Sequence, residues 1–192
     1  MPTYTFNLHL LGVQPQVTRT FKVSSEGSMY LLHHIIQVVM RWKNYHLYQF
    51  EVDGVVYADP RLDDQYEAPI TNVRDASIAD VFHTVGTTAV YEYDFGDGWV
   101  HHLELVDISN HPVNEVIPHV IAGENACPPE DCGGPYGYQQ LLEILNNPKH
   151  PEYKETRVWV GKTFNPEVFN IDDANNELGK LNKYIKEYEE DL

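Results

Sequence analysis

The first two segments of the chain alternate hydrophobic and polar residues. From Tyr4 to Leu10 every second position carries a large apolar or aromatic side chain, and residues 17–23 alternate in the same way. A period of two is typical of a strand with one face in the core. Pro15 interrupts the pattern between the two segments. We therefore expect two strands that pair as a hairpin.

A helix and a second hairpin are predicted next. The stretch SSEGS offers N-cap residues, and apolar side chains then recur at helical spacing in MYLLHHIIQVVMRW. Residues 46–52 and 55–59 are predicted strands on either side of Asp53-Gly54, a dipeptide typical of a two-residue hairpin turn. The order β-β-α-β-β over residues 4–57 favours a small mixed or antiparallel sheet with the helix across one face, as in a β-grasp.

The second half combines a further β-hairpin with C-terminal helices. Strands are predicted for residues 87–95 and 99–108, which flank a glycine-rich turn. The segment 110–137 is long, irregular and rich in Pro and Gly, with one short strand near 116–121. The other elements are a loop over 58–76, one or two helical turns over 77–82, a helix over 138–147 and a closing helix from about Asp172. No linker or repeat divides the chain, so we expect a single α+β domain over residues 1–192.

The hairpin sequence YEYDFGDGWVHH, residues 91–102, carries most of the candidate chemistry. Its Gly-Asp-Gly tripeptide at 96–98 suits a three-residue loop whose last glycine has a positive φ. This register places Glu92 opposite His102 and turns His101 toward the core. Two interpretations of this histidine stay open: a buried core residue with hydrogen-bond partners, or a site residue with aspartates at the mouth of the site.

Charge and composition narrow the classes of partner. The chain has 29 acidic residues against 13 lysines and arginines, for a net charge of -16, which repels phosphate backbones and makes a nucleic-acid partner unlikely. No apolar run reaches the roughly 18 residues of a membrane span, and the first residues alternate like a strand rather than a secretory signal. With two cysteines in such a chain, we expect reduced thiols and a cytoplasmic location.

The two cysteines bracket an acidic, Pro-containing loop, Cys127-Pro-Pro-Glu-Asp-Cys132. A structural zinc site needs four ligands, so His101, His102, His111 or His119 would have to complete the two thiols, and we expect no such site. Gly133-Gly134 leads into the next helix, with Pro135 at its first turn. No spacing typical of a nucleophile–base pair or of a cofactor-binding loop occurs, so the sequence assigns no catalytic residue, no metal ligand and no cofactor.

This CPPEDCGG loop is expected to fold back onto the hairpin and onto the flank of the first helix. A loop rich in Pro and Gly makes few backbone hydrogen bonds of its own, so its order depends on partners elsewhere. Glu130 and Asp131 offer acceptors, and Trp99 offers an indole N–H. An acidic loop near His101 would also raise the pKa of the imidazole, because an opposite charge favours the protonated form.

Five stretches together resemble the plasmid pRiA4b ORF-3-like family, some of whose members are passengers of IS1096-type transposons labelled TnpR. They are LHHIIQVVMRW, HLYQF, YEYDFGDGWVH, ACPPEDCGGPYGY and FNPEVFNIDDANNEL. The resemblance implies a prokaryotic α+β domain, carried on mobile elements and chromosomes, with no established activity. It does not make the chain a resolvase, because a serine recombinase needs a nucleophilic Ser among Arg residues and a DNA-binding domain.

The resemblance carries over to individual positions. One departure is that relatives often carry a further Cys before the Pro-Pro loop, where this chain has HVIAGENAC. The matching residues, with Glu130 and Asp131 in the loop, give a candidate binding site made of His33, Gln37, Trp42, His46, Tyr93, Asp94, Asp97, Trp99, His101, Glu130, Asp131 and Tyr138.

Two functions follow as hypotheses. The first is a non-catalytic binding or interaction module for an unknown protein or small-molecule partner. The alternative is a metal-dependent or hydrolase-like enzyme that uses Asp94, Asp97, His101 and Glu130 or Asp131. The two differ in one structural respect: an enzyme requires these acids and the histidine to converge in one cleft.

Overall fold

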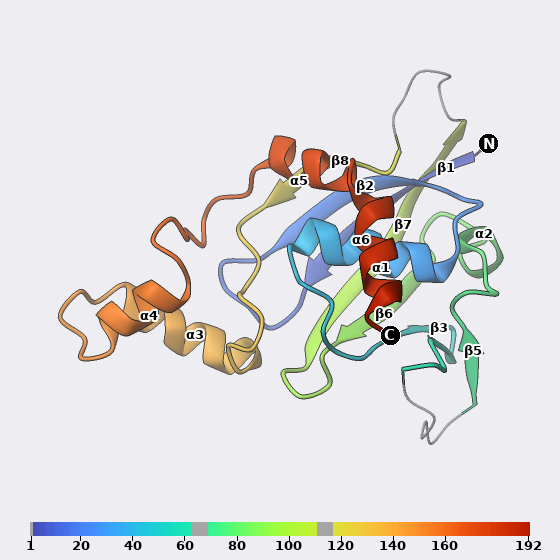
Figure 1. Cartoon of the computed structure of the whole chain (residues 1–192). Helices are drawn as coiled ribbons and strands as arrows, with labels where there is room; N and C mark the ends of the chain where they lie inside the picture. Colours follow the sequence, from blue (N-terminus) through green and yellow to red (C-terminus); the bar gives the residue numbers. More distant parts are fainter. Residues whose placement is uncertain (1, 63–68, 111–116) are drawn as a thin grey trace.

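A computed structural model of the chain describes residues 2–62, 69–110 and 117–192. Its centre is an eight-stranded mixed sheet with the strand order β5-β4-β3-β6-β7-β1-β2-β8 (Figure 1). All neighbours are antiparallel except β4 and β5, which are parallel. The strands are β1 (Pro2–Leu10), β2 (Thr18–Ser24), β3 (Tyr48–Val52), β4 (Val55–Ala58), β5 (Ile70–Asn72), β6 (Thr88–Tyr93), β7 (Trp99–Asn110) and β8 (His119–Glu124).

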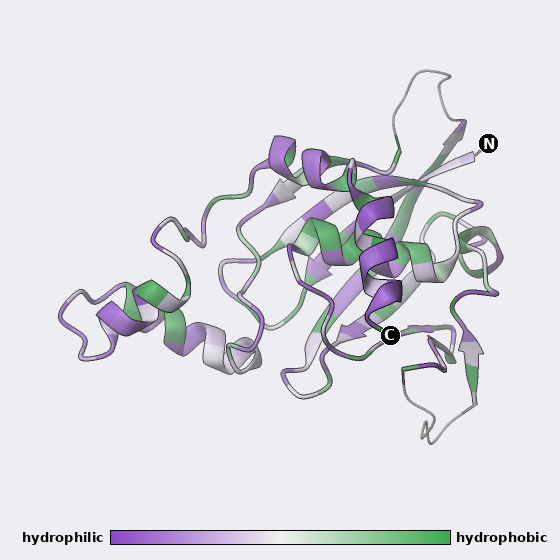
Figure 2. Ribbon diagram, in the orientation of Figure 1, coloured by the Kyte–Doolittle hydropathy of each residue, from purple (hydrophilic) through white to green (hydrophobic). Residues whose placement is uncertain are grey.

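The helices lie mainly on one side of the sheet. They are α1 (Met29–Met40), α2 (Ile78–Val81), α3 (Gly134–Leu145), α4 (Tyr153–Trp159), α5 (Ile171–Leu178) and α6 (Leu181–Glu190). In Figure 1, α1 crosses the sheet, α5 and α6 lie on the outer side of α1, and α3 and α4 extend beyond one end. Figure 2 shows that α1 is rich in hydrophobic residues and that α6 is mostly hydrophilic, as expected for an inner and an outer layer. Among the described residues, no helix has the length and apolar character that crossing a bilayer requires.

Helix α1 begins and ends at well-defined caps. The Ser28 hydroxyl accepts a hydrogen bond from the Leu31 N–H at 3.1 Å, as an N-cap does. At the other end Arg41 adopts a left-handed φ of 63°, and the Trp42 N–H bonds to the carbonyl of Gln37 at 3.0 Å. The chain therefore leaves the helix in a fixed direction, toward the turn between β6 and β7.

The α+β class is confirmed, but the β-grasp-like arrangement is not. In the sheet, β3 and β4 are separated from β1 and β2 by the β6–β7 hairpin. The reason is the pairing partner of each hairpin strand: β6 pairs with β3, while the 12-residue β7 runs along the length of β1. The strands and the helix of residues 4–57 were predicted, and the strand order of the whole sheet was not.

The register predicted for this hairpin is wrong by two residues. Tyr93 lies opposite Trp99, and Val90 rather than Glu92 lies opposite His102, so the loop has five residues. The shift is even, which keeps each side chain on its predicted face, and His101 is indeed fully buried.

Asp94 explains the longer loop. Its φ of 56° takes it out of the strand, and its Oδ1 accepts the N–H groups of Gly96 at 3.1 Å and Asp97 at 3.3 Å. The Gly98 N–H then bonds to the Asp94 carbonyl at 2.6 Å. Gly98 has the positive φ that the sequence predicts, 67°.

Other differences concern short or polar elements. The predicted loop over 58–76 contains strand β5, and helix α4 was not predicted at all. The closing helix is two helices, which meet at Gly179 and Lys180. The strand expected near 116–121 is β8, while the start of that prediction lies outside the described residues.

Candidate functional site

The CPPEDCGG loop lies against the hairpin and the end of α1, as the sequence predicts. The Trp42 indole N–H donates to the carbonyl of Pro128 at 3.0 Å, and the Lys43 N–H donates to Glu130 Oε2 at 2.8 Å. The Tyr93 hydroxyl donates to the other oxygen of Glu130 at 2.6 Å. One carboxylate therefore holds the hairpin and the chain after α1 together.

Two glycines allow the loop to approach the hairpin closely. The Gly133 N–H donates to Asp97 Oδ2 at 3.2 Å. Gly134 has a φ of 67°, and a Cβ at this position would collide with the carbonyl oxygen of Asp97. Glycine is thus required here by both the backbone angle and the contact.

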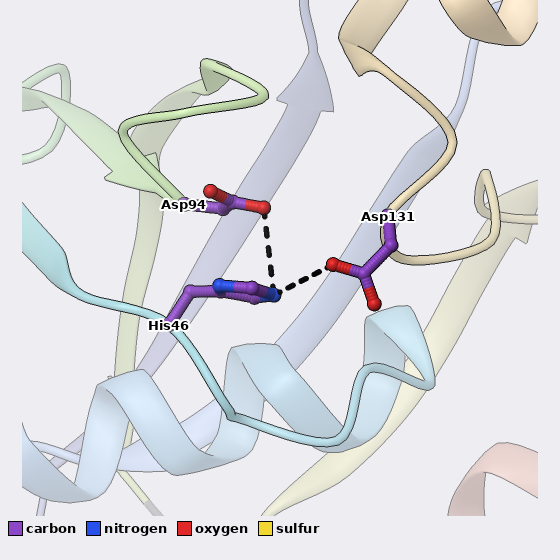
Figure 3. Close-up of side chains that lie close together, drawn as sticks. All are labelled: His46, Asp94 and Asp131. Atoms are coloured by element: carbon purple, nitrogen blue, oxygen red, sulfur yellow. Dashed lines mark hydrogen bonds and ion pairs between the residues drawn. The ribbon is translucent and has the colours of Figure 1, made fainter.

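At this junction His46, Asp94 and Asp131 turn their side chains toward one another (Figure 3). The His46 Nε2 lies 3.1 Å from Asp131 Oδ1 and 3.6 Å from Asp94 Oδ2. Each residue comes from a different segment: the chain after α1, the β6–β7 turn and the loop before α3. Asp94 is buried, whereas the Asp131 side chain is 66% exposed. The group therefore has one buried side and one side open to solvent.

Behind this group lies a second histidine, His33, which burial keeps neutral and a hydrogen-bond network orients. Burial lowers the pKa of His33 well below its usual value, and its ring stacks on Tyr48 with a 3.3 Å centroid separation. The Gln37 amide N–H donates to the Tyr91 hydroxyl at 2.9 Å.

The partners of His33 then determine its tautomer. The Tyr91 hydroxyl lies 2.8 Å from Nδ1, and the Asn44 side-chain oxygen lies 2.8 Å from Nε2. Because an amide oxygen only accepts, Nε2 carries the proton, and Nδ1 accepts from Tyr91.

Besides the Tyr48 hydroxyl, three polar atoms near this network have no hydrogen-bond partner within the part of the chain that the structure describes. These three are His34 Nε2, Gln37 Oε1 and Asn44 Nδ2. The three residues are only 4%, 2% and 9% exposed. Burial, followed by the positive charge of Arg74, lowers the pKa of His34 to about 4.

All three residues line a pocket of about 980 Å³ between α1, the segment after it and α6. One wall is a single stripe of α1, and the other is a stripe of α6 at the same helical spacing. His46 also lines this pocket, so it joins the pocket to the two aspartates described above. The stripes are His34, Gln37 and Val38 on α1 with Arg41 just past its end, and Tyr184, Glu187 and Tyr188 on α6 with Asp191 just past its end.

His101 does not take part in this junction. It is fully buried, its Nδ1–H donates to the carbonyl of Tyr91 at 3.2 Å, and its ring packs edge-on against Trp42. Burial lowers the pKa of His101 to about 4, so the raised pKa expected from an acidic neighbour is wrong. The acidic loop lies on the outer side of the Trp42 and Tyr93 rings. Desolvation, rather than the charge of the loop, therefore decides the protonation state of His101.

Trp99 and Tyr138 are also core residues rather than parts of an accessible site. Both are at most 1% exposed. The indole N–H of Trp99 and the hydroxyl of Tyr138 have no hydrogen-bond partner among the described residues. Of the candidate site, the structure therefore brings together the residues near α1, Glu130 and the aspartates, and places His101, Trp99 and Tyr138 behind them.

The two cysteines are free thiols. Burial raises the pKa of Cys127 above its usual value and that of Cys132 to about 12. Both are therefore protonated at neutral pH, and neither is a nucleophile poised for reaction.

The profile of the plasmid pRiA4b ORF-3-like protein family matches residues 2–173. The chain belongs to this family. One pRiA4b ORF-3-like relative is the uncharacterized protein y4hQ of Sinorhizobium fredii (strain NBRC 101917 / NGR234), 33% identical over 174 residues, or 90% of this chain and 85% of the relative.

The pRiA4b ORF-3-like chain is also similar to a solved structure. This is the crystal structure of a protein of unknown function, MM3350, from Methanosarcina mazei Go1. The two share 32% sequence identity and a TM-score of 0.80, over 90% of this chain and 97% of the other. Neither relative has an established activity, so the function has to be argued from the site itself.

Sequence reasoning missed one wall of the pocket. His34, Arg41 and Asn44 were overlooked beside residues that were selected, and the stripe with Tyr184 and Tyr188 was seen only as part of a closing helix. The available signal was the helical spacing of His34 and Gln37 on α1, continued by Arg41 just past its end.

Proposed function

We propose that this protein is a non-catalytic binding module that takes up a small polar molecule in the pocket between α1 and α6. The observation that carries the proposal is the set of three polar side chains, His34, Gln37 and Asn44, which are more than nine-tenths buried, line the pocket and have no partner among the described residues. A buried polar group without a partner costs about 1–3 kcal/mol. A ligand that supplies the partners recovers this free energy.

The hydrogen-bond network defines what the ligand must offer. The amide N–H of Gln37 is used by Tyr91, which leaves its oxygen as an acceptor. The oxygen of Asn44 is used by His33, which leaves its amide N–H as a donor. We infer that the ligand presents a donor beside an acceptor, as a carboxamide, a lactam or the edge of a nucleobase does.

The same geometry supports binding rather than catalysis. Asp97 and Glu130 accept backbone N–H groups of other segments, and one oxygen of Asp94 holds its own turn. His101 lies in the core, and the pKa values of His33 and His34 are far below neutrality, so these groups do not exchange protons at pH 7.

Three further points complete the proposal. We infer that residues 1–192 act as one domain, since the C-terminal α5 and α6 pack on α1 from the first half. The acidic net charge argues against a nucleic-acid partner, and the two free thiols support a cytoplasmic location. The plasmid in the family's name supports an association with mobile elements.

The test uses a variant that fills the pocket and leaves the hydrogen-bond network around His33 unchanged. Val38 is half-buried on the pocket side of α1, so Val38→Phe occupies the space a ligand needs. The matched control is Val158→Phe on α4, where the valine is exposed and outside the pocket.

The probes are nicotinamide, 2-pyrrolidone and uracil, each of which places an N–H beside a carbonyl. Saturation-transfer NMR should detect at least one of them on the wild type and on Val158→Phe, and a much weaker signal on Val38→Phe. Binding by none of the probes, or equal binding to both variants, would contradict the proposal.

A further inference from the structure

We propose that His46, Asp94 and Asp131 bind one divalent transition-metal cation, with Zn²⁺ the best match, at the edge of the pocket. The inference goes beyond the proposed function, which needs no metal. Three ligand atoms, one from each side chain, lie within 4.8 Å of one another. They converge from three segments that are far apart in the sequence (Figure 3).

The separations between these atoms suit a shared ion. Ligand atoms bound to one zinc at about 2.0–2.2 Å lie roughly 3–3.6 Å apart in a tetrahedral arrangement. The His46 nitrogen is 3.1 Å from one carboxylate oxygen and 3.6 Å from the other. The two carboxylate oxygens are at most 4.8 Å apart, and Asp131 is the exposed ligand of the three, so an ion is accommodated when the Asp131 carboxylate moves to close this last separation.

Two of the three ligands, Asp94 and His46, are held in place by neighbours. Asp94 uses Oδ1 for the turn N–H groups of Gly96 and Asp97, which leaves Oδ2 facing His46. The His46 ring packs edge-on against Tyr93 at 5.8 Å, and Tyr93 is tied to Glu130. Support of this kind orients ligands before the metal arrives.

The donor atoms select the class of metal. One imidazole nitrogen with two carboxylates suits zinc and its neighbours in the first transition row, whereas Ca²⁺ and Mg²⁺ prefer oxygen ligands alone. Three protein ligands leave a coordination position free. Because the Asp131 side chain is 66% exposed, that position opens toward solvent.

Charge also favours a cation. Two carboxylates face a single imidazole, and among the described residues the ion pairs of Asp94 and Asp131 involve His46 rather than a lysine or arginine. The chain as a whole carries a net charge of -16. A divalent ion is thus attracted to the group and does not compete with a lysine or arginine for the two carboxylates.

An independent observation points to a ligand at this place. Asn44, two residues before His46, is nine-tenths buried, lines the same pocket and has an amide N–H with no partner among the described residues. The amide nitrogen itself is covered, so a molecule in the pocket that bonds to it after a small movement of the Asn44 side chain lies beside the segment that carries His46. Only this last step rests on the proposed function. The assignment of the three protein ligands does not.

The test is a titration of the full chain, freed of metal with a chelator, with Zn²⁺ alone. Calorimetry should give one ion per chain, and Co²⁺ should show visible absorption bands typical of nitrogen and oxygen ligands. His46→Gln and Asp131→Asn should each weaken binding by about tenfold or more. Asparagine tolerates the left-handed backbone of Asp131, so unchanged melting of Asp131→Asn separates ligand loss from misfolding.

Two controls make the outcome decisive. The double variant Cys127→Ala/Cys132→Ala should bind the ion normally, and loss of binding there would place the metal on the thiols and overturn the proposal. Binding that survives in both His46→Gln and Asp131→Asn, or no binding by the wild type, would also overturn it. Val38→Phe should keep the ion, so failure of the pocket and failure of the metal site are distinguishable.

Discussion

Three histidines around the site are buried and neutral, and each ring is oriented by different neighbours. His33 is fixed by Tyr91 and Asn44, His101 by a backbone carbonyl, and His34 lies under α6 between tyrosine rings. In each case burial is the largest cause of the lowered pKa. A neutral imidazole can donate one hydrogen bond and accept another at the same time, which suits a buried network. Keeping the ring neutral costs stability when the pH falls, because the unfolded chain then binds the proton more readily.

His101 provides the residue-scale prediction. The unfolded chain binds a proton on this histidine below pH 6.5, whereas the folded protein does so only below about 4. The contribution of the neutral His101 to the unfolding free energy is therefore complete above pH 6.5, and it is lost as the pH falls from 6.5 to about 4. In His101→Asn, which keeps a side-chain N–H, the loss of unfolding free energy between pH 7 and 4.5 should be smaller by about 2–3 kcal/mol.

Urea unfolding at several pH values measures this difference. His83→Gln is the matched control, because His83 is exposed, and it should leave the pH dependence as in the wild type. An identical loss in His101→Asn and in the wild type would show that His101 titrates normally in the folded protein.

At the scale of elements, the β6–β7 hairpin and the loop before α3 act as one unit. Glu130 of the loop accepts hydrogen bonds from the Tyr93 hydroxyl and the Lys43 N–H. Asp97 of the hairpin accepts one from the Gly133 N–H. Burial raises the pKa of Tyr93, so its hydroxyl remains a donor to the carboxylate at all ordinary pH values.

The Tyr93–Glu130 contact can be measured by a double-mutant cycle. Tyr93→Phe and Glu130→Gln should show a coupling of about 1–2 kcal/mol in unfolding free energy, because the bond is charge-assisted and partly buried. As a control, Tyr93→Phe should be additive with Glu155→Gln on α4, an exposed carboxylate outside the junction. Additivity within about 0.5 kcal/mol for the first pair would mean that the contact does not hold the loop.

Elements with local signals were predicted well, and those with distant causes were not. Ser28 as an N-cap, the Asp53-Gly54 turn and the faces of the hairpin depend only on neighbouring residues. The hairpin register failed because the Asp94 carboxylate builds a longer turn, which the glycine spacing does not reveal. Helix α4 was missed because none of its residues is buried, so it has no apolar stripe to detect.

The candidate site shows the same division. The junction was found because its residues sit in compact motifs, Trp42 and His46 in one and Glu130 and Asp131 in another. The pocket was not found, since its second wall is α6, a polar helix more than a hundred residues away in the sequence. The three side chains of the proposed metal site were selected individually, but their convergence depends on the left-handed turn at Asp94.

At the scale of the whole molecule, a network of ion pairs joins the C-terminal helix α6 to the first half of the chain. Asp59, which follows β4, is fully buried and pairs with Arg61 and Arg74, both at 3.0 Å. Glu189 on α6 pairs with the same arginines, at 3.1 and 2.6 Å. It also accepts a hydrogen bond from Tyr30 on α1. The wall of the pocket therefore stays in place through arginines that two carboxylates share.

The two carboxylates should contribute unequally, which gives the last prediction. Asp59→Asn leaves two arginines beside a fully buried neutral group and should cost about 3 kcal/mol of unfolding free energy. Glu189 is 32% exposed, so Glu189→Gln should cost only about 1 kcal/mol, because solvent screens the pair. Urea unfolding measures both costs. Hydrogen exchange should nevertheless become faster in α6 of Glu189→Gln, since this helix loses its link to Arg74 and Tyr30. A larger cost for Glu189→Gln than for Asp59→Asn, or unchanged exchange in α6, would show that apolar packing rather than the charge network holds this wall of the pocket.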